Sequence, residues 1–302
     1  MNGNPTLKEI QIGGQAVIEG VVMRGPHRWA LAVRRPDGGI TVMVNPSDTL
    51  ADRFPRLNRP PFRGVITLLD SLIIGFRSIA LSAEISLDRE EGPPAVGEGD
   101  SRALGPAHLA VTMVLALVVF LGLFIALPAV VARPLDRYVN STVMYNLMEG
   151  GIRIAIFLAY LAAISLLPDI RRVFQYHGAE HKVVHAYEAG EPLTPASAAR
   201  FSTAHMRCGT TFILVILVVS VLLFSLTGRP ALWLRVVERL ALIPLVAAVS
   251  YEIIRFASRH EKLPAVRAVM TPGLILQKIT TREPDREQLE VAIDALNAAL
   301  EG

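Results

Sequence analysis

The run LAVTMVLALVVFLGLFIALPAVV, residues 109–131, contains a single polar side chain, Thr112, and no charge. A transmembrane helix needs about 20 apolar residues to cross the roughly 30 Å hydrocarbon core of a bilayer, so this run is long enough. The run FILVILVVSVLLFSL, residues 212–226, is equally apolar. Both runs predict membrane-spanning helices, and the fold class that follows is a mainly α membrane protein.

The composition of the whole chain agrees with a membrane protein. Of 302 residues, 52% are hydrophobic and 19% are charged, compared with about 25% charged in ordinary soluble domains. This hydrophobicity excludes a disordered chain, and the single cysteine, Cys208, excludes an intramolecular disulfide. The formal charge of +3 is spread along the chain, so we expect no nucleic-acid partner.

We expect about four transmembrane helices, at residues 109–131, 152–167, 211–226 and 232–254. The fourth is the weakest because Arg235, Glu238 and Arg239 fall in its first half. Charged side chains near the end of a span usually extend to the membrane surface, and we interpret these three in that way, together with Glu149 and Arg153.

The distribution of Lys and Arg predicts the orientation. The basic residues of the loops that we place outside are Arg133, Arg137 and Arg229 alone. Basic residues are abundant in residues 1–63, in residues 169–210 and after span four. Cytoplasmic loops carry the excess of Lys and Arg. Both termini and the central segment are therefore expected in the cytoplasm. The first residues lack the pattern of a signal peptide.

Four segments flank the expected four-span domain, 106–258: a cytoplasmic β unit over 1–62, an interfacial helix over 63–87, a flexible acidic linker over 88–105, and a cytoplasmic tail with a helix over 259–302. In the β unit, Pro36-Asp37-Gly38-Gly39 joins two apolar runs and is a hairpin signal. In the tail, Asp285 can cap a helix. Residues 274–276, before it, indicate a short strand.

The expected helix over 63–87 carries one polar stripe on an otherwise apolar surface. Its members are spaced by seven: Arg63, Asp70, Arg77 and Glu84. Such a helix lies at the membrane interface, or it packs among the spans with its stripe facing protein. We favour the first arrangement, in which the stripe is a solvated edge.

The candidate functional residues lie in the central segment, 169–210. The stretch HGAEHKVVH places His177, His181 and His185 one turn apart on one face of a helix. Two imidazoles one turn apart suit a single metal ion. His177 and His185 would lie about 12 Å apart along the axis. The pair is therefore either His177/His181 or His181/His185, and the third histidine has another task or a second metal.

Two further ligand types follow at His205 and Cys208, just before the third span. With two histidines of the helix they would complete a tetrahedral zinc shell of the structural type, whereas one ligand fewer leaves room for water and catalysis. Thiol and imidazole favour zinc, with another divalent metal as the alternative. Gln15, Glu19 and Arg24 reach this site only if the β unit docks on it, which we do not expect.

The stretch from His177 to His181 also matches the H-x-x-E-H arrangement, in which a glutamate beside two metal ligands is the general base. Glu180 is therefore the candidate catalytic residue. Taken singly, an interfacial histidine is usually solvated and Cys208 is a small apolar filler. The gathering of these residue types within one short segment favours a metal site over coincidence.

Four stretches are long enough to be specific: GGQAVIEGVVMRGP (13–26), YHGAEHKVVHAYEAG (176–190), HMRCGTTF (205–212) and PGLILQKITTREPDREQLEVAI (272–293). Together they resemble the YqhQ-like family of bacterial membrane proteins, which is of unknown function and labelled as predicted metal-dependent enzymes. The resemblance implies a multi-pass protein of the bacterial inner membrane. The family pattern has proline where this chain has His205-Met206. The residues carried over are therefore His177, Glu180, His181, His185 and Cys208.

The leading hypothesis is a membrane-bound, zinc-dependent enzyme of hydrolytic type at the cytoplasmic face, with Glu180 as the base that takes a proton from water. The sequence indicates no substrate. The alternative is a non-enzymatic transporter or scaffold, in which the histidine cluster binds a metal structurally or in transit. The lipid bilayer is the partner that the sequence identifies. Protein partners are not indicated, and a homo-oligomer stays open.

Overall fold

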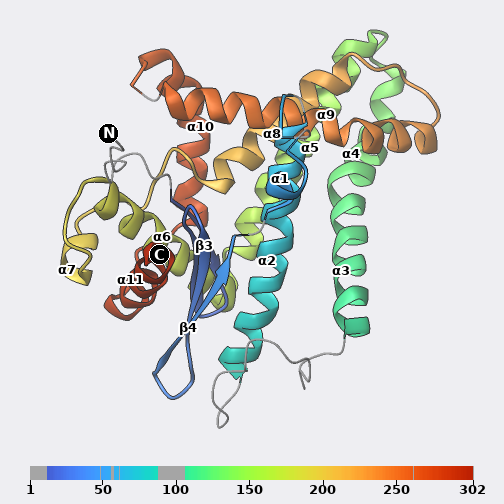
Figure 1. Cartoon of the computed structure of the whole chain (residues 1–302). Helices are drawn as coiled ribbons and strands as arrows, with labels where there is room; N and C mark the ends of the chain where they lie inside the picture. Colours follow the sequence, from blue (N-terminus) through green and yellow to red (C-terminus); the bar gives the residue numbers. More distant parts are fainter. Residues whose placement is uncertain are drawn as a thin grey trace.

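The computed structural model describes residues 12–47, 49–55, 58–60, 62–87, 106–260 and 262–301, so the expected linker 88–105 lies outside the described residues. The strands are β1 (Gly13–Val17), β2 (Gly20–Arg24), β3 (Arg28–Arg34) and β4 (Ile40–Pro46). The longer helices are α2 (Arg63–Leu87), α3 (Pro106–Leu121), α5 (Thr142–Ile164), α6 (Pro168–Glu188), α8 (Gly209–Ser225), α9 (Leu232–Arg259), α10 (Pro264–Thr280) and α11 (Arg286–Leu300). The short ones are α1 (Leu50–Arg53), η2 (Gly122–Ala126), α4 (Leu127–Val131), η3 (Arg133–Arg137) and α7 (Pro195–Ala198). The expected mainly α architecture with a small N-terminal β unit is confirmed (Figure 1).

The four strands pair in sequence order, each antiparallel to the next. The turn between β1 and β2 places Glu19 at φ 52°, a left-handed conformation that few residues other than glycine adopt. In the turn between β3 and β4, Gly38 has φ 89°, which glycine adopts without steric cost. The hairpin predicted from the Pro-Asp-Gly-Gly stretch is therefore confirmed.

The sheet is covered on both faces. One face packs against α6 and α11, where Val21 and Leu296 belong to the same buried cluster. The other face packs against α2, where Val22 and Leu31 are buried with Ile85. Successive side chains of a strand point to opposite faces, so Val21 and Val22 enter different cores. Contrary to our expectation, the β unit docks directly on α6, the helix that carries the histidines.

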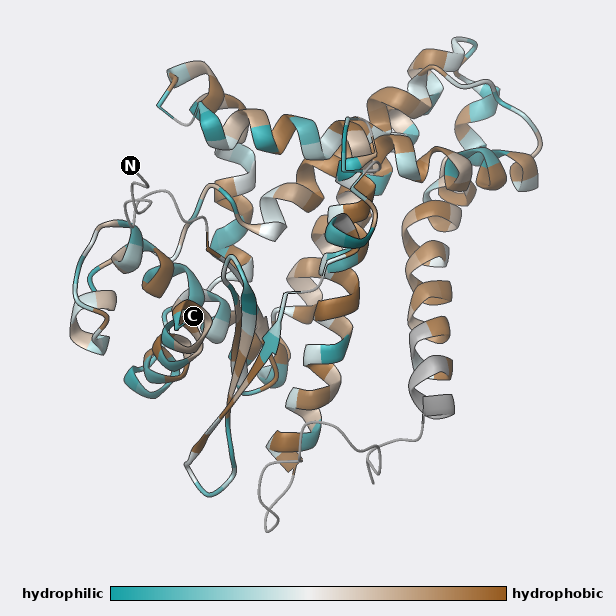
Figure 2. Ribbon diagram, in the orientation of Figure 1, coloured by the Kyte–Doolittle hydropathy of each residue, from teal (hydrophilic) through white to brown (hydrophobic). Residues whose placement is uncertain are grey.

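Among the described residues, four helical segments are long and apolar enough to cross a membrane: Arg63–Leu87, Val114–Arg137, Thr142–Ile164 and Leu232–Arg259. The expected number of four candidate spans is confirmed, but α2 is one of the four, whereas the predicted span at 211–226 is not. The predicted span at 211–226 forms α8, which is apolar but has only 17 residues. The predicted span at 152–167 begins earlier, because the Ser141 side chain caps α5 by accepting the backbone N–H of Met144. Figure 2 shows α3 as almost uniformly hydrophobic where it is coloured.

The polar stripe of α2 faces protein over the first part of the helix. Asp70 is only 7% exposed and accepts the backbone N–H of Leu50 at 2.8 Å. Arg63 pairs with Glu252 of α9. Our interpretation of the stripe as a solvated edge is therefore wrong for these residues, because partners from distant segments satisfy them. Arg77, further along, is exposed and lies over the Trp29 ring at 5.8 Å.

The charged residues of α5 and α9 do not extend to the membrane surface as expected. Glu149 is fully buried, and Arg153 and Arg239 are 3% and 2% exposed. Both guanidinium groups pair with the Glu149 carboxylate. Arg153 also donates to the Phe124 carbonyl at 2.9 Å, within the π-helical turn η2. Such a turn interrupts the regular helix ladder and is often found at functional positions.

Residues 274–276, expected as a strand, lie inside α10. Gly273 lets this helix approach α8 closely, because a Cβ at that position would lie 2.7 Å from Cγ2 of Thr211. Leu276 is buried in the same contact region. A run of three apolar residues fits a buried helix as well as a strand, which is why the sequence pattern misled us. The predicted cap is confirmed, since Asp285 begins α11 with a capping box.

Candidate metal centre

Helix α6 presents its three histidines on one face. Its opposite face is apolar, with Ala179 and Val183 fully buried in the cluster shared with the sheet and α11. Because positions three and four apart share a helix face, His177, His181 and His185 lie together on the side of the segment that precedes α8. Packing against the sheet therefore fixes the direction in which the imidazoles point.

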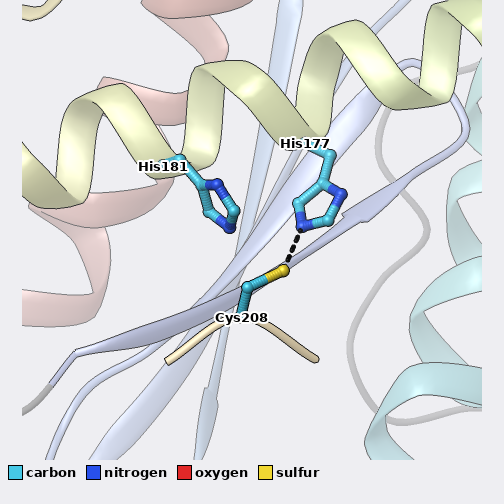
Figure 3. A group of neighbouring side chains, drawn as sticks. All are labelled: His177, His181 and Cys208. Atoms are coloured by element: carbon cyan, nitrogen blue, oxygen red, sulfur yellow. Dashed lines mark hydrogen bonds between the residues drawn. The ribbon is translucent and has the colours of Figure 1, made fainter. Parts of the chain in front are cut away.

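The first cluster consists of His177, His181 and Cys208 (Figure 3). One ligand atom from each residue lies within 4.8 Å of the others. Nε2 of His177 is 3.3 Å from Sγ of Cys208. Cys208 is 5% exposed and is the N-cap of α8. Its Sγ accepts the backbone N–H of Thr210 at 3.3 Å, which fixes the direction of the side chain.

Backbone carbonyls fix the tautomer of both histidines in the first cluster. Nδ1 of His177 lies 2.9 Å from the Thr280 carbonyl oxygen, and Nδ1 of His181 lies 2.5 Å from that of Thr203. A carbonyl oxygen only accepts, so each Nδ1 carries the proton and donates. Each Nε2 then keeps its lone pair on the side of Cys208. Histidine ligands of protein metal sites are usually oriented by such a bond.

Glu180 lies at the edge of the first cluster. Its Oε2 is 3.4 Å from Nε2 of His181, and the residue is 6% exposed. Gly14 of β1 leaves room for it, because a Cβ at that position would lie 2.5 Å from Cγ of Glu180. Docking of the sheet therefore holds the Glu180 carboxylate beside His181.

The second cluster consists of His185, Glu188 and His205, whose ligand atoms also lie within 4.8 Å of one another. Nδ1 of His205 accepts the backbone N–H of Arg207 at 3.2 Å, so Nε2 carries the proton and faces Glu188 at 3.3 Å. Arg207 also pairs with Glu188. Protein partners thus engage both the carboxylate and the imidazole, which makes this cluster the weaker candidate for a metal.

The five predicted ligands therefore fall into two groups instead of one shell. Of the two pairs that the sequence left open, His177/His181 joins Cys208, while His205 turns away to Glu188. In the second group, burial lowers the pKa of His185 below its usual value, and the neighbouring His205 lowers it further. Sequence reasoning did not name Glu188 as a ligand, although its spacing on the histidine stripe was a usable signal.

A cavity of about 370 Å³ opens beside both clusters. Its lining joins the histidine helix, the start of β1, the first turn of α8 and one residue of α2: Ile12, Gly13, Gly14, Thr67, His177, Glu180, His181, Val184, His205, Arg207, Cys208 and Gly209. Sequence reasoning missed Thr67 and the Gly13-Gly14 pair as parts of the site. The glycine pair was a signal of close backbone approach, but it did not indicate the neighbour.

Gln277 of α10 forms hydrogen bonds with the turn that contains His205 and Cys208. It is fully buried, and its Oε1 accepts the backbone N–H of His205 at 2.8 Å. Its Nε2 donates to the His205 carbonyl at 2.8 Å and to Oγ1 of Thr211 at 2.7 Å. One amide therefore ties α10 to the segment 205–208 and to α8. Nothing in the local sequence distinguished this glutamine from a surface residue.

Three polar residues of the β unit do not line the cavity although the sheet docks: Gln15, Glu19 and Arg24. Glu19 pairs with Arg172 of α6, and Arg24 donates to Oγ of Ser71 on α2 at 3.1 Å. These contacts fasten the sheet to its two helices. The part of the β unit that reaches the site is the backbone at Gly14, not a polar side chain.

Four segments apolar enough to cross a membrane, together with a His/Cys cluster beside a buried glutamate, define the class: a helical, membrane-type protein with a candidate metal centre. The chain belongs to the family described as protein of unknown function (DUF1385), whose model matches residues 59–302. It is 35% identical over 296 residues to the uncharacterized protein YqhQ of Bacillus subtilis (strain 168), covering 95% of this chain and 92% of that protein. The resemblance to the YqhQ-like family is thereby confirmed. No solved structure matches the chain significantly.

Proposed function

We propose that this protein is a membrane-bound, zinc-dependent hydrolase that acts at the cytoplasmic face of a bacterial inner membrane. The observation that supports it most is the cluster of His177, His181 and Cys208 beside buried Glu180. Three protein ligands leave the fourth tetrahedral position open, which is the arrangement of catalytic zinc sites, whereas structural sites are closed by four.

The donor set suits zinc better than other divalent ions. One thiolate and two neutral imidazoles are borderline-soft ligands, which favour zinc over magnesium, calcium or manganese. His181 and Cys208 are buried and His177 is half-buried, and backbone carbonyls accept from Nδ1 of both histidines. Zinc bound there supplies Lewis-acid chemistry, which polarises carbonyl or phosphoryl oxygens and lowers the pKa of water.

Glu180 is positioned to act as the general base. Its carboxylate lies within 3.4 Å of Nε2 of His181, on the side of the cavity. A base must lie within hydrogen-bond reach of the proton that it removes, and Glu180 would lie beside a water activated by zinc that His177, His181 and Cys208 would hold. Burial between Gly14 and α6 holds its orientation. In this mechanism Glu180 removes a proton from the attacking water and can return it to the leaving group.

The surroundings of the cavity support a substrate at the membrane surface. Thr67 of α2 lines the cavity, and the later part of α2 packs through Ile85 against the soluble sheet. The outer side of the same helix exposes Leu72, Ile73 and Phe76. A helix with one side on a soluble domain and an apolar outer side suits the membrane interface. In this proposal α2, although long and apolar enough to cross a membrane, lies at the membrane interface, and the site lies beside the lipid surface.

The excess of Lys and Arg in the sheet and in the central segment supports the cytoplasmic placement of the site. The loop regions at the other ends of α5 and α8 contain fewer basic residues: Arg133, Arg137 and Arg229. Basic loops near spans stay in the cytoplasm. On this basis both termini, the sheet and the histidine helix lie on the same, cytoplasmic side.

Elemental mass spectrometry of the detergent-purified full chain tests the metal site. We expect about one zinc per chain, the stoichiometry of a single tetrahedral site, and its loss in His181→Ala. Cys208→Ser should also lose zinc, yet it keeps a helix-capping side chain and therefore the fold. His260→Ala, which alters an exposed histidine at the end of α9, is the matched control and should retain zinc. Wild-type protein without metal, after purification free of chelators, would overturn the proposal.

The role of Glu180 is tested separately from the metal. Glu180→Gln keeps the size of the side chain but removes its basicity, so it should retain zinc. Hydrolysis of the peptide, lipid or phosphoester that the wild type cleaves in a substrate screen should fall by about 10²-fold or more, because a general base contributes on that scale. Unchanged hydrolysis in Glu180→Gln would remove the base assignment and leave the metal site standing.

A second candidate function is a non-enzymatic metal transporter or scaffold. The observation that favours it is the closeness of the two clusters: the ring of His181, from the first cluster, lies 5.7 Å from the ring of His205, from the second. A metal could move from one cluster to the other over such a distance. Zinc uptake into vesicles that depends on His181, without any hydrolysis, would favour this candidate over the hydrolase.

A further inference from the structure

A second cavity, of about 360 Å³, lies far from the metal cluster. Its lining includes Arg229, which follows the end of α8, whereas Cys208 caps the start of that helix. With 17 residues, α8 is about 25 Å long. The two cavities therefore lie at opposite ends of α8 and of α5, the helix that packs against it.

The second cavity is strongly basic. Three arginines and one carboxylate are the charged groups that line it: Arg133, Arg229, Arg235 and Asp136. Arg229 donates through Nη1 to Asp136 at 3.3 Å and to the Val139 carbonyl at 2.9 Å. Its Nε and Nη2 are buried, and within the described part of the chain they have no hydrogen-bond partner. The same guanidinium group lies over the Tyr145 ring at 4.6 Å, so a ring face and not a hydrogen-bond acceptor covers it.

Arg235 has only a shared carboxylate partner. It donates to the Tyr145 hydroxyl at 3.0 Å and to the Pro230 carbonyl at 3.3 Å. It also pairs with Glu149 at 3.8 Å, but that carboxylate pairs with Arg239 and Arg153 as well. One buried carboxylate therefore serves three guanidinium groups. Nε of Arg235 has no hydrogen-bond partner among the described residues, and the side chain is 7% exposed. A buried, uncompensated charge is costly, so an anion at this place would stabilise the helix ends.

Two exposed aromatic residues beside this cavity indicate its position relative to the membrane surface. Trp233, beside the lining residue Leu232, is 70% exposed, and Tyr138, close to Asp136, is 81% exposed. Trp and Tyr are enriched where a membrane meets water, at the level of the lipid headgroups. The basic cavity therefore lies at the height at which phosphate groups of lipids are found.

We propose that this cavity binds a phosphate group, supplied by the headgroup of an anionic phospholipid or by free phosphate. Guanidinium groups present parallel N–H donors that match two oxygens of a phosphate, and such charge-assisted pairs are the strongest hydrogen bonds of proteins. The volume is within the range of ordinary small-ligand sites. The bound anion neutralises Arg229 and Arg235 and joins η3 to the start of α9.

Isothermal titration calorimetry on the detergent-solubilised full chain tests this site with two probes, short-chain phosphatidylglycerol and inorganic phosphate. We expect saturable binding of at least one probe and a loss of affinity of about tenfold or more in Arg229→Gln, because charge-assisted hydrogen bonds are removed. Binding of phosphatidylglycerol alone identifies a lipid headgroup as the source, and binding of phosphate identifies the free anion. Arg137→Gln, on the same short helix but outside the cavity lining, should bind like the wild type.

Arg133→Gln keeps the test decisive if Arg229→Gln does not fold. Arg133 lines the cavity but is exposed, so its replacement should leave the protein folded and still weaken binding severalfold. No binding of either probe to the wild type would overturn the proposal. Equal binding by Arg133→Gln, Arg229→Gln and the wild type would overturn it as well.

Discussion

Gly14 shows how one residue without a side chain shapes the candidate site. The space that a Cβ would occupy at this position is filled by the Glu180 side chain. The neighbouring Gly13 has nothing within 4 Å of its own Cβ position. The two adjacent glycines therefore have different roles. Only Gly14 has to lack a side chain so that β1 can approach Glu180 closely.

Gly14→Ala should destabilise the protein by about 1–3 kcal/mol, the usual cost of overpacking a well-packed site. Gly13→Ala is the matched control and should change the free energy of unfolding by less than half as much. Denaturant titration of the detergent-solubilised protein measures both. If the clash with Glu180 is the cause, Gly14→Ala should cost much less in a Glu180→Ala background, because residues in contact are energetically coupled. Equal costs in both backgrounds would contradict this explanation.

At the scale of the helices, α5 and α9 are held together by charges. The buried Glu149 carboxylate of α5 accepts from Arg239 of α9, with Nη2 to Oε2 at 2.5 Å, and from Arg153 of its own helix at 3.2 Å. The ring of Phe224 lies under both of these guanidinium groups, and the ring of Tyr145 lies under that of Arg235. The contact between the two helices therefore depends on one carboxylate among several cations.

Glu149→Gln should destabilise the helical part strongly, by about 3–5 kcal/mol, because removing one partner leaves buried charges uncompensated. Asp169→Asn, which removes an exposed carboxylate at the start of α6, is the matched control and should have little effect. The measurement is the monodisperse yield on size exclusion together with the thermal unfolding midpoint in detergent. A Glu149→Gln protein as stable as the control would show that the arginines are satisfied in another way.

At the scale of the whole molecule, the sheet, α6 and α11 form a compact body (Figure 1). The lining residues place the two cavities at opposite ends of α5 and α8. The proposed hydrolase acts on the side of the sheet, and the proposed phosphate site lies on the other side. This arrangement requires that α8, although only 17 residues long, crosses the membrane with its two ends in different compartments.

Labelling with a membrane-impermeant maleimide in a Cys208→Ser background tests this arrangement. Asp37→Cys, in the exposed turn between β3 and β4, should react only after the cells are permeabilised. Tyr138→Cys, near the basic cavity, should react in intact cells. The parent without cysteine is the control and should not be labelled. Reaction of Asp37→Cys in intact cells would reverse the orientation inferred from the basic residues.

Much of the fold could be predicted from local sequence patterns. Long apolar runs predict helices because backbone groups in a membrane must be satisfied within the segment. The Pro-Asp-Gly-Gly stretch predicts a hairpin because glycine adopts positive φ, as Gly38 does. The spacing of His177, His181 and His185 predicts a common helix face. Each of these features depends on residues that are neighbours along the chain.

The geometry of the candidate site could not be predicted from local patterns, because it depends on contacts between segments that are distant in the sequence. His177 is oriented by the carbonyl of Thr280, 103 positions away, and His205 by Gln277, 72 positions away. No local pattern indicates that His205 turns to Glu188 while Cys208 joins His177. Periodicity states which side of a helix a residue occupies, but it does not state which other element covers that side.

The same reason explains the two corrections with the largest consequences. The pairing of Glu149 with Arg239 and the docking of the sheet on α6 both join elements far apart in the chain. Apolar periodicity and turn residues were sufficient for most of the helices, for the β3–β4 hairpin and for the membrane-like character, but not for residues 274–276. The partners of buried charges and the grouping of ligands follow from how complete elements pack, because packing is a property of the assembled chain and not of any one segment.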